Sequence, residues 1–412
     1  MSLDAEVHVS TLKCGVTLLV EPMSDVQSAA YSILVPAGTV YEPNGANGAA
    51  AVLADIVTRG AGNYDSRELN DRFDRMGVQR SEVNGWHFLS FNGALLPGHL
   101  SASLELYADV LLRAHLPADE LEAAVVGVEQ SLRAMEDEPQ RKVFVEVRRS
   151  TYDDPWGRPP EGTLSELPNI TPEVIRGIYD SGFRPNGTII GVAGRVDAER
   201  VRRQLDELLT DWQPQGEAIL KPGPRQPSVR HISHDSAQTH VGLAWEAAPF
   251  GHPDYYAAWA AANILGGSSS SRLFTEVRER RGLCYSVATS LNSVLDQGRI
   301  FAYVGTTTER AQETLDVTIS EIAKMNQGIE RGELERCQAN AKSALVMQQE
   351  STSARASSIA RDWFYLGRVQ TLAEVHEQVQ SLTVDQVQDY LRRQQPGEMT
   401  LITVGSQPLR IG

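Results

Sequence analysis

Two hydrophobic patterns alternate along the chain, one typical of strands and the other of helices. Short apolar runs bounded by turn residues predict strands, whereas apolar residues at one-face spacing predict amphipathic helices. In the first half the predicted strands are 16–20, 30–35, 78–83, 88–94 and 188–192. The predicted helices are 48–58, 66–76, 99–113, one from 117 towards 139, and 172–179. Because helices and strands do not alternate one by one, this order favours an α+β fold over strict βαβ winding.

Similar sequence features return in the second half of the chain. Residues 184–194 and 395–405 share a proline and a glycine at matching positions, 211 residues apart. The triplet Glu-Leu-Glu occurs at 120–122 and again at 333–335, 213 residues later. These matching residues recur at nearly the same spacing, which is about half the chain length, and this regularity indicates a duplicated domain.

A segment rich in proline and glycine, 213–229, separates the two halves and is poor in apolar residues. Such a composition is typical of a linker. We therefore expect an N-terminal domain at 1–212 and a C-terminal domain at 230–412. Each is expected to be an α/β sandwich in which helices cover a mostly antiparallel sheet.

The composition is that of an ordinary folded protein, since 41% of the 412 residues are hydrophobic and 22% are charged. A net charge of −15 argues against broad binding to nucleic acid or to anionic membranes, because both need a positive field. Three separated cysteines, Cys14, Cys284 and Cys337, form no disulfide framework and fit a reducing compartment. The sequence begins without the features of a signal peptide, so we expect a cytoplasmic location, or a periplasmic one if a leader was removed.

One stretch, 266–287, contains the strongest candidate chemistry. Its glycines and serines predict a mobile loop, and Ser271 is expected to cap a short helix that ends at Gly282. After Gly282 the residues alternate as in a half-buried strand, with Tyr285 on the same face as its apolar neighbours. Arg278, in the last helical turn, and Tyr285 flank one tight turn, so they are expected to point into the same space.

Other motifs in the chain predict no chemistry. The glycines at 266–267 lack the spacing of a phosphate loop, and no Lys-Ser/Thr follows them. His231 and His234 have no third ligand nearby and fit polar surface better than a metal site. The serine run 268–271 has neither a nucleophile elbow nor a partner histidine close by.

Most of the chain resembles a known enzyme family. The resemblance is most specific in the segments 253–258, 264–268, 271–274, 277–279 and 282–287. They look like the C-terminal half of the insulinase/pitrilysin family of zinc metallopeptidases. Within this family, the chain resembles the two-domain bacterial members and the subunits of mitochondrial processing peptidase. The resemblance implies that Gly266, Gly267 and Ser268 bind substrate.

In this family the N-terminal half is expected to have H-x-x-E-H on a helix, with two zinc-binding histidines and a glutamate that activates water. A further glutamate ligand is expected about 76 residues later. The helix at 48–60 keeps the framing glycines and the apolar face of that motif. However, Ala51 and Asp55 stand at the histidine positions, Ala54 stands at the glutamate position, and the later ligand position holds Ser131. We therefore expect no zinc site on this chain.

The resemblance implies a different role for the second half. In the family an arginine and a tyrosine seven residues apart reach the substrate held at the zinc, and Arg278 and Tyr285 have this spacing. The chain therefore resembles the non-zinc subunit of a heterodimeric metalloendopeptidase. A homologous partner subunit would bring the zinc, and an unfolded peptide substrate would bind by adding a strand to a sheet edge.

Two alternatives stay open. The first is a structural or peptide-binding relative without catalysis, like the core subunits of a respiratory complex. The spacing of Arg278 and Tyr285 favours the peptidase subunit, because a scaffold does not need it. The second is an independent hydrolase with another nucleophile, which no group of residues in the sequence supports.

Overall fold

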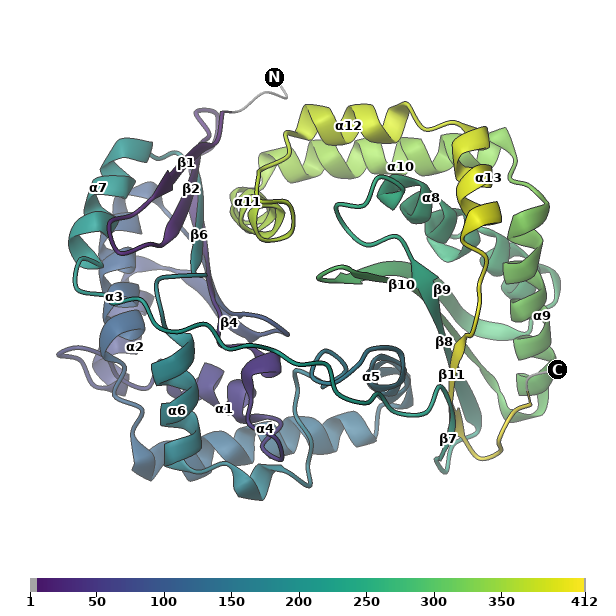
Figure 1. Cartoon of the computed structure of the whole chain (residues 1–412), viewed down its shortest axis with the longest axis horizontal. Coiled ribbons are helices and arrows are strands. Elements are labelled where there is room, and N and C mark those ends of the chain that lie inside the picture. The colour runs from purple at the N-terminus through teal and green to yellow at the C-terminus, as the bar shows by residue number, and fades with distance from the viewer. Residues whose placement is uncertain (1–5, 411–412) are drawn as a thin grey trace. The chain divides into compact units, whose positions relative to one another are not determined.

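The computed structural model describes residues 6–410, and the chain divides into two compact units. Each unit is built around one sheet with helices on its faces (Figure 1). Each also combines most of one half of the sequence with a segment of the other half. Unit 1 comprises Met1–Arg133, Arg158–Pro222 and Val346–Ala373, and unit 2 comprises Ala134–Gly157, Gly223–Leu345 and Glu374–Gly412.

Within the described residues, the sheet of unit 1 has six strands in the order β1-β2-β6-β3-β5-β4. Strands β2 and β6 are parallel, and the other neighbouring pairs are antiparallel. The strands are β1 (His8–Thr11), β2 (Thr17–Pro22), β3 (Ala29–Val35), β4 (Gln79–Asn84), β5 (Leu89–Leu95) and β6 (Ile189–Gly194). The sequence pattern located β2 to β6 to within about two residues, as is usual for element boundaries.

In the part of the chain that the structure describes, the sheet of unit 2 has five strands in the order β7-β11-β8-β10-β9. Without its edge strand β1, the sheet of unit 1 has the matching order β2-β6-β3-β5-β4. The one parallel pair falls at the same place in both, as β2–β6 and as β7–β11. The predicted duplication and the mostly antiparallel sheets are thus confirmed. The strands are β7 (Val229–Ser233), β8 (Gln238–Ala247), β9 (Cys284–Val294), β10 (Gln297–Thr307) and β11 (Thr400–Gly405).

Helices lie on both faces of the unit 1 sheet (Figure 1). Local signals set their ends, as in α2, where Asp65 and Glu68 form a capping box and Gly77 ends the helix in the left-handed conformation. Helix α2 has the predicted bounds. The helices are α1 (Ala49–Ile56), α2 (Ser66–Met76), α3 (Leu100–Arg113), α4 (Leu121–Glu136), α6 (Pro172–Gly182), α7 (Ala198–Leu208) and α11 (Thr352–Leu366).

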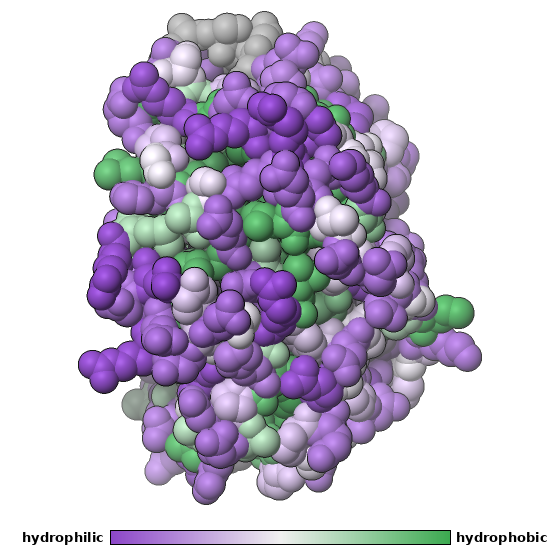
Figure 2. Space-filling model, turned by 90° about the vertical axis from the view of Figure 1, so that its left-hand side faces the viewer, coloured by the Kyte–Doolittle hydropathy of each residue, from purple (hydrophilic) through white to green (hydrophobic). Residues whose placement is uncertain are grey.

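Helices α2, α3 and α7 lie on the side of unit 1 that Figure 2 shows. This face is mostly hydrophilic, with hydrophobic groups visible between the polar ones. The helices bury apolar residues such as Leu69, Phe73 and Leu205, as expected for amphipathic helices packed on a sheet. Among residues 6–410, no helix combines the length and the hydrophobicity that crossing a bilayer requires.

Helices α8, α9 and α13 cover the core of unit 2, whose buried residues include Val241, Leu265, Leu315 and Val387. The helices of this unit are α5 (Pro139–Thr151), α8 (Tyr255–Gly266), the π-helix η5 (Phe274–Arg280), α9 (Ala311–Lys324), α10 (Arg331–Glu350), α12 (Leu372–Gln380) and α13 (Val384–Arg393). Short 3₁₀ helices join the elements of both units: η1 (Thr39–Tyr41), η2 (Pro97–His99), η3 (Ala118–Glu120), η4 (Leu167–Asn169), η6 (Thr308–Arg310) and η7 (Met325–Gln327).

The two halves of the sequence exchange one helix each. Helix α5, from the first half, packs on β8 and β11, and α11, from the second half, packs on β3 and β6 (Figure 1). A glycine in each sheet makes room for the helix. A Cβ at Gly191 would lie 2.3 Å from the carbonyl oxygen of Ala356, and a Cβ at Gly242 would lie 2.5 Å from Cγ2 of Val147. Non-bonded atoms do not approach so closely. Each helix can therefore pack this tightly on its sheet only because a glycine stands at that position.

Ion pairs fix both exchanged helices. Arg355 of α11 donates from Nε to the two carboxylate oxygens of Glu21 in β2, at 3.0 and 2.9 Å, and both side chains are 4% exposed. In unit 2, Arg230 of β7 contacts Glu146 of α5 at 2.9 Å. Strands β2 and β7 hold matching places in their sheets, so both units use the same strand for this contact, with the charges reversed.

Arg355→Met should lower the free energy of unfolding by about 3–5 kcal/mol, because it leaves the Glu21 carboxylate buried without a partner. The double variant Glu21→Leu/Arg355→Met should recover most of this loss, since neither charge remains. Urea unfolding of the whole chain measures both. Arg75→Met, which breaks the exposed pair with Asp71, is the matched control and should change stability by less than about 0.5 kcal/mol. An equal loss in the single and double variants would contradict this account.

Candidate functional site

Arg278 lies on η5, a helix of the π type, which holds an extra residue in its turn and is frequent at functional sites. Its guanidinium carbon lies 4.7 Å from the centroid of the Phe274 ring and 5.8 Å from that of the Tyr285 ring. Within residues 6–410 its side chain makes no hydrogen bond and no ion pair. The structure thus brings Arg278 and Tyr285 together and leaves the N–H donors of the arginine available.

A tight turn joins η5 to strand β9. Gly282 has φ of 59°, in the left-handed region that glycine adopts without strain. Its N–H donates to the carbonyl of Arg278 at 3.0 Å, and the N–H of Leu283 donates to the carbonyl of Val277 at 2.8 Å. These bonds satisfy the last carbonyls of the helix, so the predicted glycine stop is confirmed.

A β-bulge places Tyr285 outside the regular pattern of β9. The pairing with β10 shifts by one residue between Gly305 and Thr306, so Tyr285 has no residue opposite it. The residue is 80% exposed, whereas Leu283 and Val287 are buried. The predicted alternation, with Tyr285 on the face of these apolar neighbours, is wrong here because the bulge inserts one residue and turns the side chain outward.

Side chains from β10 and η6 hold the turn between the two residues. Arg310 donates to the carbonyl of Gly282 at 2.5 Å and to that of Arg281 at 3.1 Å. Thr306 donates from Oγ1 to the carbonyl of Leu283 at 2.6 Å. Three successive carbonyls are therefore held by side chains of other elements, and such support keeps a pair of donors in a fixed orientation.

Cys284 lies beside the pair but does not supply a nucleophile. Burial raises the pKa of its thiol to about 11, and the positive charge of Arg278 only partly opposes this rise. Because the thiolate is the reactive form of cysteine, this residue is inert at neutral pH. The chemistry of the turn is therefore that of hydrogen-bond donors.

The glycine-serine loop, residues 266–271, links α8 to η5. Gly266 is buried, and a Cβ there would lie 2.8 Å from Thr289, so its backbone packs directly on β9. Gly267 and Ser268 are at least partly exposed. Ser271 directly precedes the helix, as expected, and its carbonyl accepts from the N–H of Thr275 at 3.0 Å, but its Oγ donates to the carbonyl of Ser268 at 2.6 Å and forms no capping bond with the helix. Of the three loop residues predicted to bind substrate, the structure exposes two.

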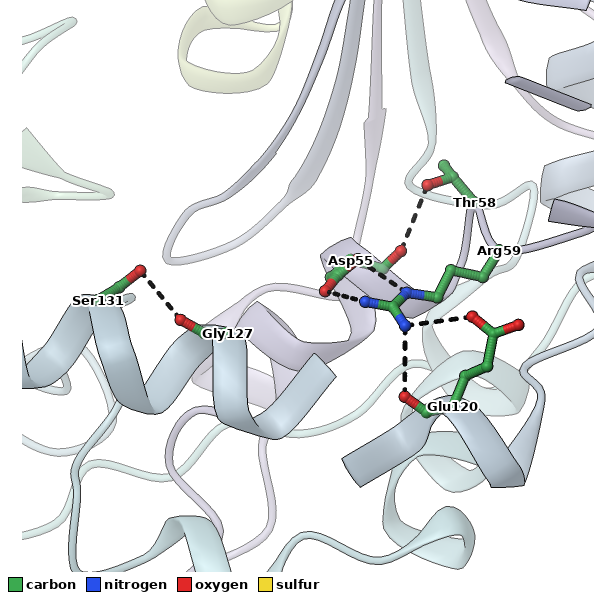
Figure 3. Close-up of polar contacts among 6 residues, drawn as sticks. All are labelled: Asp55, Thr58, Arg59, Glu120, Gly127 and Ser131. Carbon is green, nitrogen blue, oxygen red and sulfur yellow. Dashed lines mark hydrogen bonds and ion pairs between the residues drawn. The ribbon is translucent and has the colours of Figure 1, made fainter. Parts of the chain in front are cut away.

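The positions of the expected zinc motif lie on α1 and α4 (Figure 3). Ala51 and Ala54 have no side-chain ligand atoms. Arg59 binds both carboxylate oxygens of Asp55, from Nε at 3.1 Å and from a terminal nitrogen at 2.9 Å. Ser131 donates from Oγ to a carbonyl one turn earlier in α4, at 3.2 Å. Each polar group at these positions therefore has a partner within the chain.

Helices α1 and α4 lie side by side at these positions. A Cβ built at Gly127 would be 4.0 Å from Oδ2 of Asp55, and Arg59 also contacts Glu120, directly before α4, at 3.2 Å. One carboxylate already held by an arginine does not fit a zinc ion, which takes three or four His, Cys, Asp or Glu ligands. Within residues 6–410, no group of three or more such side chains could hold a metal ion.

A buried carboxylate supports the N-terminus of α1. Glu42 accepts hydrogen bonds from the backbone N–H groups of Gly48 at 3.0 Å and Ala50 at 2.8 Å, and from Nδ2 of Asn47 at 2.7 Å. These bonds satisfy donors that a helix start leaves free. Burial raises the pKa of Glu42 to about 7, although the donors oppose this rise. Sequence patterns did not single out Glu42, because it lies outside the helix that it supports.

Comparison with known proteins identifies the family. The family model described as "Insulinase (Peptidase family M16)" matches residues 18–163, and the one described as "Peptidase M16 inactive domain" matches residues 169–341. The chain belongs to the insulinase family. The predicted family is thereby confirmed.

This insulinase-family chain has similar relatives in several bacteria. It is 26% identical over 389 residues to an "Uncharacterized zinc protease" of Bacillus subtilis, covering 93% of this chain and 94% of that protein. It is 23% identical over 382 residues to another protein of that description from Rickettsia felis, covering 92% and 93%. The words zinc and protease in these names describe the relatives.

Solved structures share the fold of the whole chain. A peptidase M16 inactive domain from Pseudomonas fluorescens has a TM-score of 0.89 at 21% identity and covers 98% of this chain and 99% of its own. A protease from Helicobacter pylori also has a TM-score of 0.89, at 20% identity, covering 97% and 99%. A chain of complex III2 from Candida albicans has a TM-score of 0.83 at 18% identity, covering 97% and 96%. At these identities the likeness establishes the fold.

The stability of this family member should depend on pH through Glu42. Folding raises the pKa of its carboxyl from 4.5 to about 7, so the folded state binds the proton more tightly than the unfolded state. The contribution is fully present below about pH 4.5 and is lost as the pH rises through about 7, by up to about 3 kcal/mol. Glu42→Gln should remove this loss, so urea midpoints of the wild type should fall relative to the variant between about pH 5 and 8.

Glu122→Gln, which changes an exposed carboxylate on α4, is the control. Its urea midpoint should have the same pH dependence as that of the wild type. A difference between wild type and Glu42→Gln that stays constant with pH would contradict the raised pKa.

Proposed function

We propose that this chain is the non-zinc subunit of a heterodimeric insulinase-family metalloendopeptidase. In this proposal Arg278 and Tyr285 bind the peptide and stabilise the transition state, while a homologous partner subunit carries the zinc. One observation carries the proposal: a π-helix and a β-bulge expose an arginine beside a tyrosine, and neither side chain has a hydrogen-bond partner within residues 6–410. Donors left free at a fixed turn are suited to a ligand that comes from outside the chain.

The two side chains supply different donors. Arg278 offers a forked pair of N–H groups that can hold a substrate carbonyl, whereas the hydroxyl of Tyr285 can donate to the oxyanion that forms as the scissile carbon becomes tetrahedral. Because Arg310 and Thr306 hold the turn, little reorganisation is needed when the substrate arrives. The zinc of the partner would supply the activated water.

An unfolded peptide is the proposed substrate class. Strand β9, which begins next to Tyr285, and strand β4 each lie at one edge of their sheet, so their outer backbone groups can pair with an added strand. Val83 on β4 is 50% exposed and offers an apolar contact at such an edge. A net charge of −15 disfavours nucleic acid and anionic membranes as partners, and three buried, unpaired cysteines suit the proposed cytoplasmic location.

A structural role without catalysis is the second candidate. It is favoured by the likeness in fold to the chain of complex III2. A scaffold has no need of free donors at Arg278 and Tyr285, so their exposure favours the peptidase subunit. Peptide hydrolysis by the chain together with a zinc-bearing partner distinguishes the two candidates.

The purified chain alone should hold much less than one zinc per molecule, because Asp55 is the single carboxylate at the motif positions and Arg59 already binds it. Elemental analysis after dialysis measures the zinc content. The zinc-bearing partner, purified in the same way, is the positive control. About one tightly held zinc per chain, lost in Asp55→Ala, would overturn the division of roles between two subunits.

Tyr285→Phe and Arg278→Ala should each lower kcat of the reconstituted pair by about 10²–10³, because each removes a donor aimed at charge that develops in the transition state. Arg278→Ala should also raise KM, since the arginine contacts the ground-state carbonyl as well. The assay is steady-state hydrolysis of a quenched fluorescent peptide, with size-exclusion chromatography to confirm assembly.

Arg280→Ala is the matched control for this experiment. Arg280 lies on the same π-helix, but its guanidinium pairs with Glu276 and is not proposed to reach the substrate. Full activity in both Tyr285→Phe and Arg278→Ala would refute the proposed roles and favour the scaffold.

A further inference from the structure

A small pocket lies beneath the glycine-serine loop of unit 2. Its volume is about 20 Å³, room for roughly one water molecule. The end of α8, the loop and α10 form its walls, so it lies within one compact unit. Its polar lining includes Ser268, Ser270, Glu333, Arg336 and Asn340.

Arg336 lines this pocket with a guanidinium that no carboxylate in the described part of the chain binds directly. Within residues 6–410 its side chain makes no hydrogen bond and no ion pair. The carboxylate in the wall, Glu333, is held by Arg272 through two contacts of 2.7 Å. Burial alone would raise the pKa of Glu333, but hydrogen bonds from Arg272 and from the backbone N–H of Glu330, together with the charges of Arg272 and Arg336, lower it. Glu333 is therefore ionised and hydrogen-bonded to Arg272, whereas Arg336 acts on it only through its charge and keeps its N–H donors available.

Uncharged donors accompany Arg336. The hydroxyls of Ser268 and Ser270 lie 3.2 Å apart and share one hydrogen bond, so one of their two O–H groups can still donate. The amide of Asn340 makes no hydrogen bond with any residue that the structure describes. Burial raises the pKa of the Cys337 thiol to about 12, so this neighbour adds no negative charge. The pocket therefore combines one cation with several donors.

We propose that this pocket binds a carboxylate group of the peptide substrate, with Arg336 as the residue that selects for it. One carboxylate oxygen enters the pocket, where the free hydroxyl and the amide of Asn340 donate to it, and Arg336 neutralises the charge at the mouth. The inference rests on the proposed function, in which the glycine-serine loop binds peptide.

The charge and the size of the pocket match a carboxylate better than other small ions. A metal cation would be repelled by Arg336, and the single carboxylate of the wall is already held by Arg272. A phosphate group has more oxygens and a charge near −2, whereas this pocket offers one unpaired cation and room for one oxygen. A carboxylate has one charge and can insert a single oxygen.

The carboxylate could be the C-terminus of the peptide or the side chain of an Asp or Glu, and four labelled peptides of one sequence distinguish these sources. The first has a free C-terminus, the second an amidated one, the third is amidated with a central Glu, and the fourth replaces that Glu by Gln. Fluorescence anisotropy with the full chain alone gives the dissociation constants. We expect the free-acid peptide, the Glu peptide or both to bind roughly tenfold tighter than the matched neutral peptide, with the preference weakening in high salt.

Arg336→Gln should abolish this preference and leave the affinity for the neutral peptides unchanged. Asn340→Ala should reduce the preference in part. Arg331→Gln is the matched control, because Arg331 lies on the same helix, pairs with Glu335 and does not line the pocket. Circular dichroism confirms that the variants fold, which the exposure of Arg336 leads us to expect.

Three results would overturn the inference. They are equal affinity of the wild type for all four peptides, a preference that survives Arg336→Gln, and a loss in Arg336→Gln that is the same for acidic and neutral peptides. Because the assay uses this chain alone, a carboxylate preference without hydrolysis by the reconstituted pair would refute the proposed catalysis and support the pocket. Hydrolysis by the reconstituted pair without a carboxylate preference would refute carboxylate binding in the pocket and would still support the proposed catalysis.

Discussion

The close approach of α11 to the sheet of unit 1 is the constraint on which the rest of the structure depends. It requires Gly191 under the helix and a buried ion pair between Arg355 and Glu21. The core of unit 1 is incomplete without this helix, since Leu19 and Ile189 of the sheet cluster with Ile359 of α11. Helix α5 has the corresponding role in unit 2, and the chain changes unit after residues 133 and 345, positions 212 residues apart. Both repeats therefore exchange the same helix, and neither half of the sequence has a complete core of its own.

Two local irregularities, one on each side of Gly282, give the candidate site its geometry. The π-helix holds an extra residue before the turn, and the β-bulge holds another after it. In a regular strand Tyr285 would share a face with Leu283 and Val287 and would be buried with them. The bulge turns it outward beside Arg278 instead. Because Arg310 binds two carbonyls of the turn, the geometry of the turn does not depend on a ligand.

Most of the architecture could be predicted from the sequence, because local periodicity and the repeat offset carry that information. The strands β2 to β6, the helix at 66–76 and the turn at Gly282 follow from patterns within a few residues. The exchange of α5 and α11 could not be predicted, because it depends on contacts between distant segments such as Glu21 and Arg355. The exposure of Tyr285 and the contacts of Arg310 were missed for the same reason, since a bulge and a backbone contact across strands leave no periodic signal.

The two faces of α1 explain how an insulinase-family chain can keep its fold without zinc ligands. Val52, Leu53 and Ile56 are buried and hold the helix in the core, whereas Asp55, at a ligand position, is exposed. Glu42 satisfies the helix N-terminus from outside the motif. The packing of α1 therefore rests mainly on residues other than Ala51 and Asp55, so histidines can be absent from those two positions while the packing stays intact. In the proposed function, the free donors of Arg278 and Tyr285 act together with the zinc of a partner subunit, which is why we propose a divided active site.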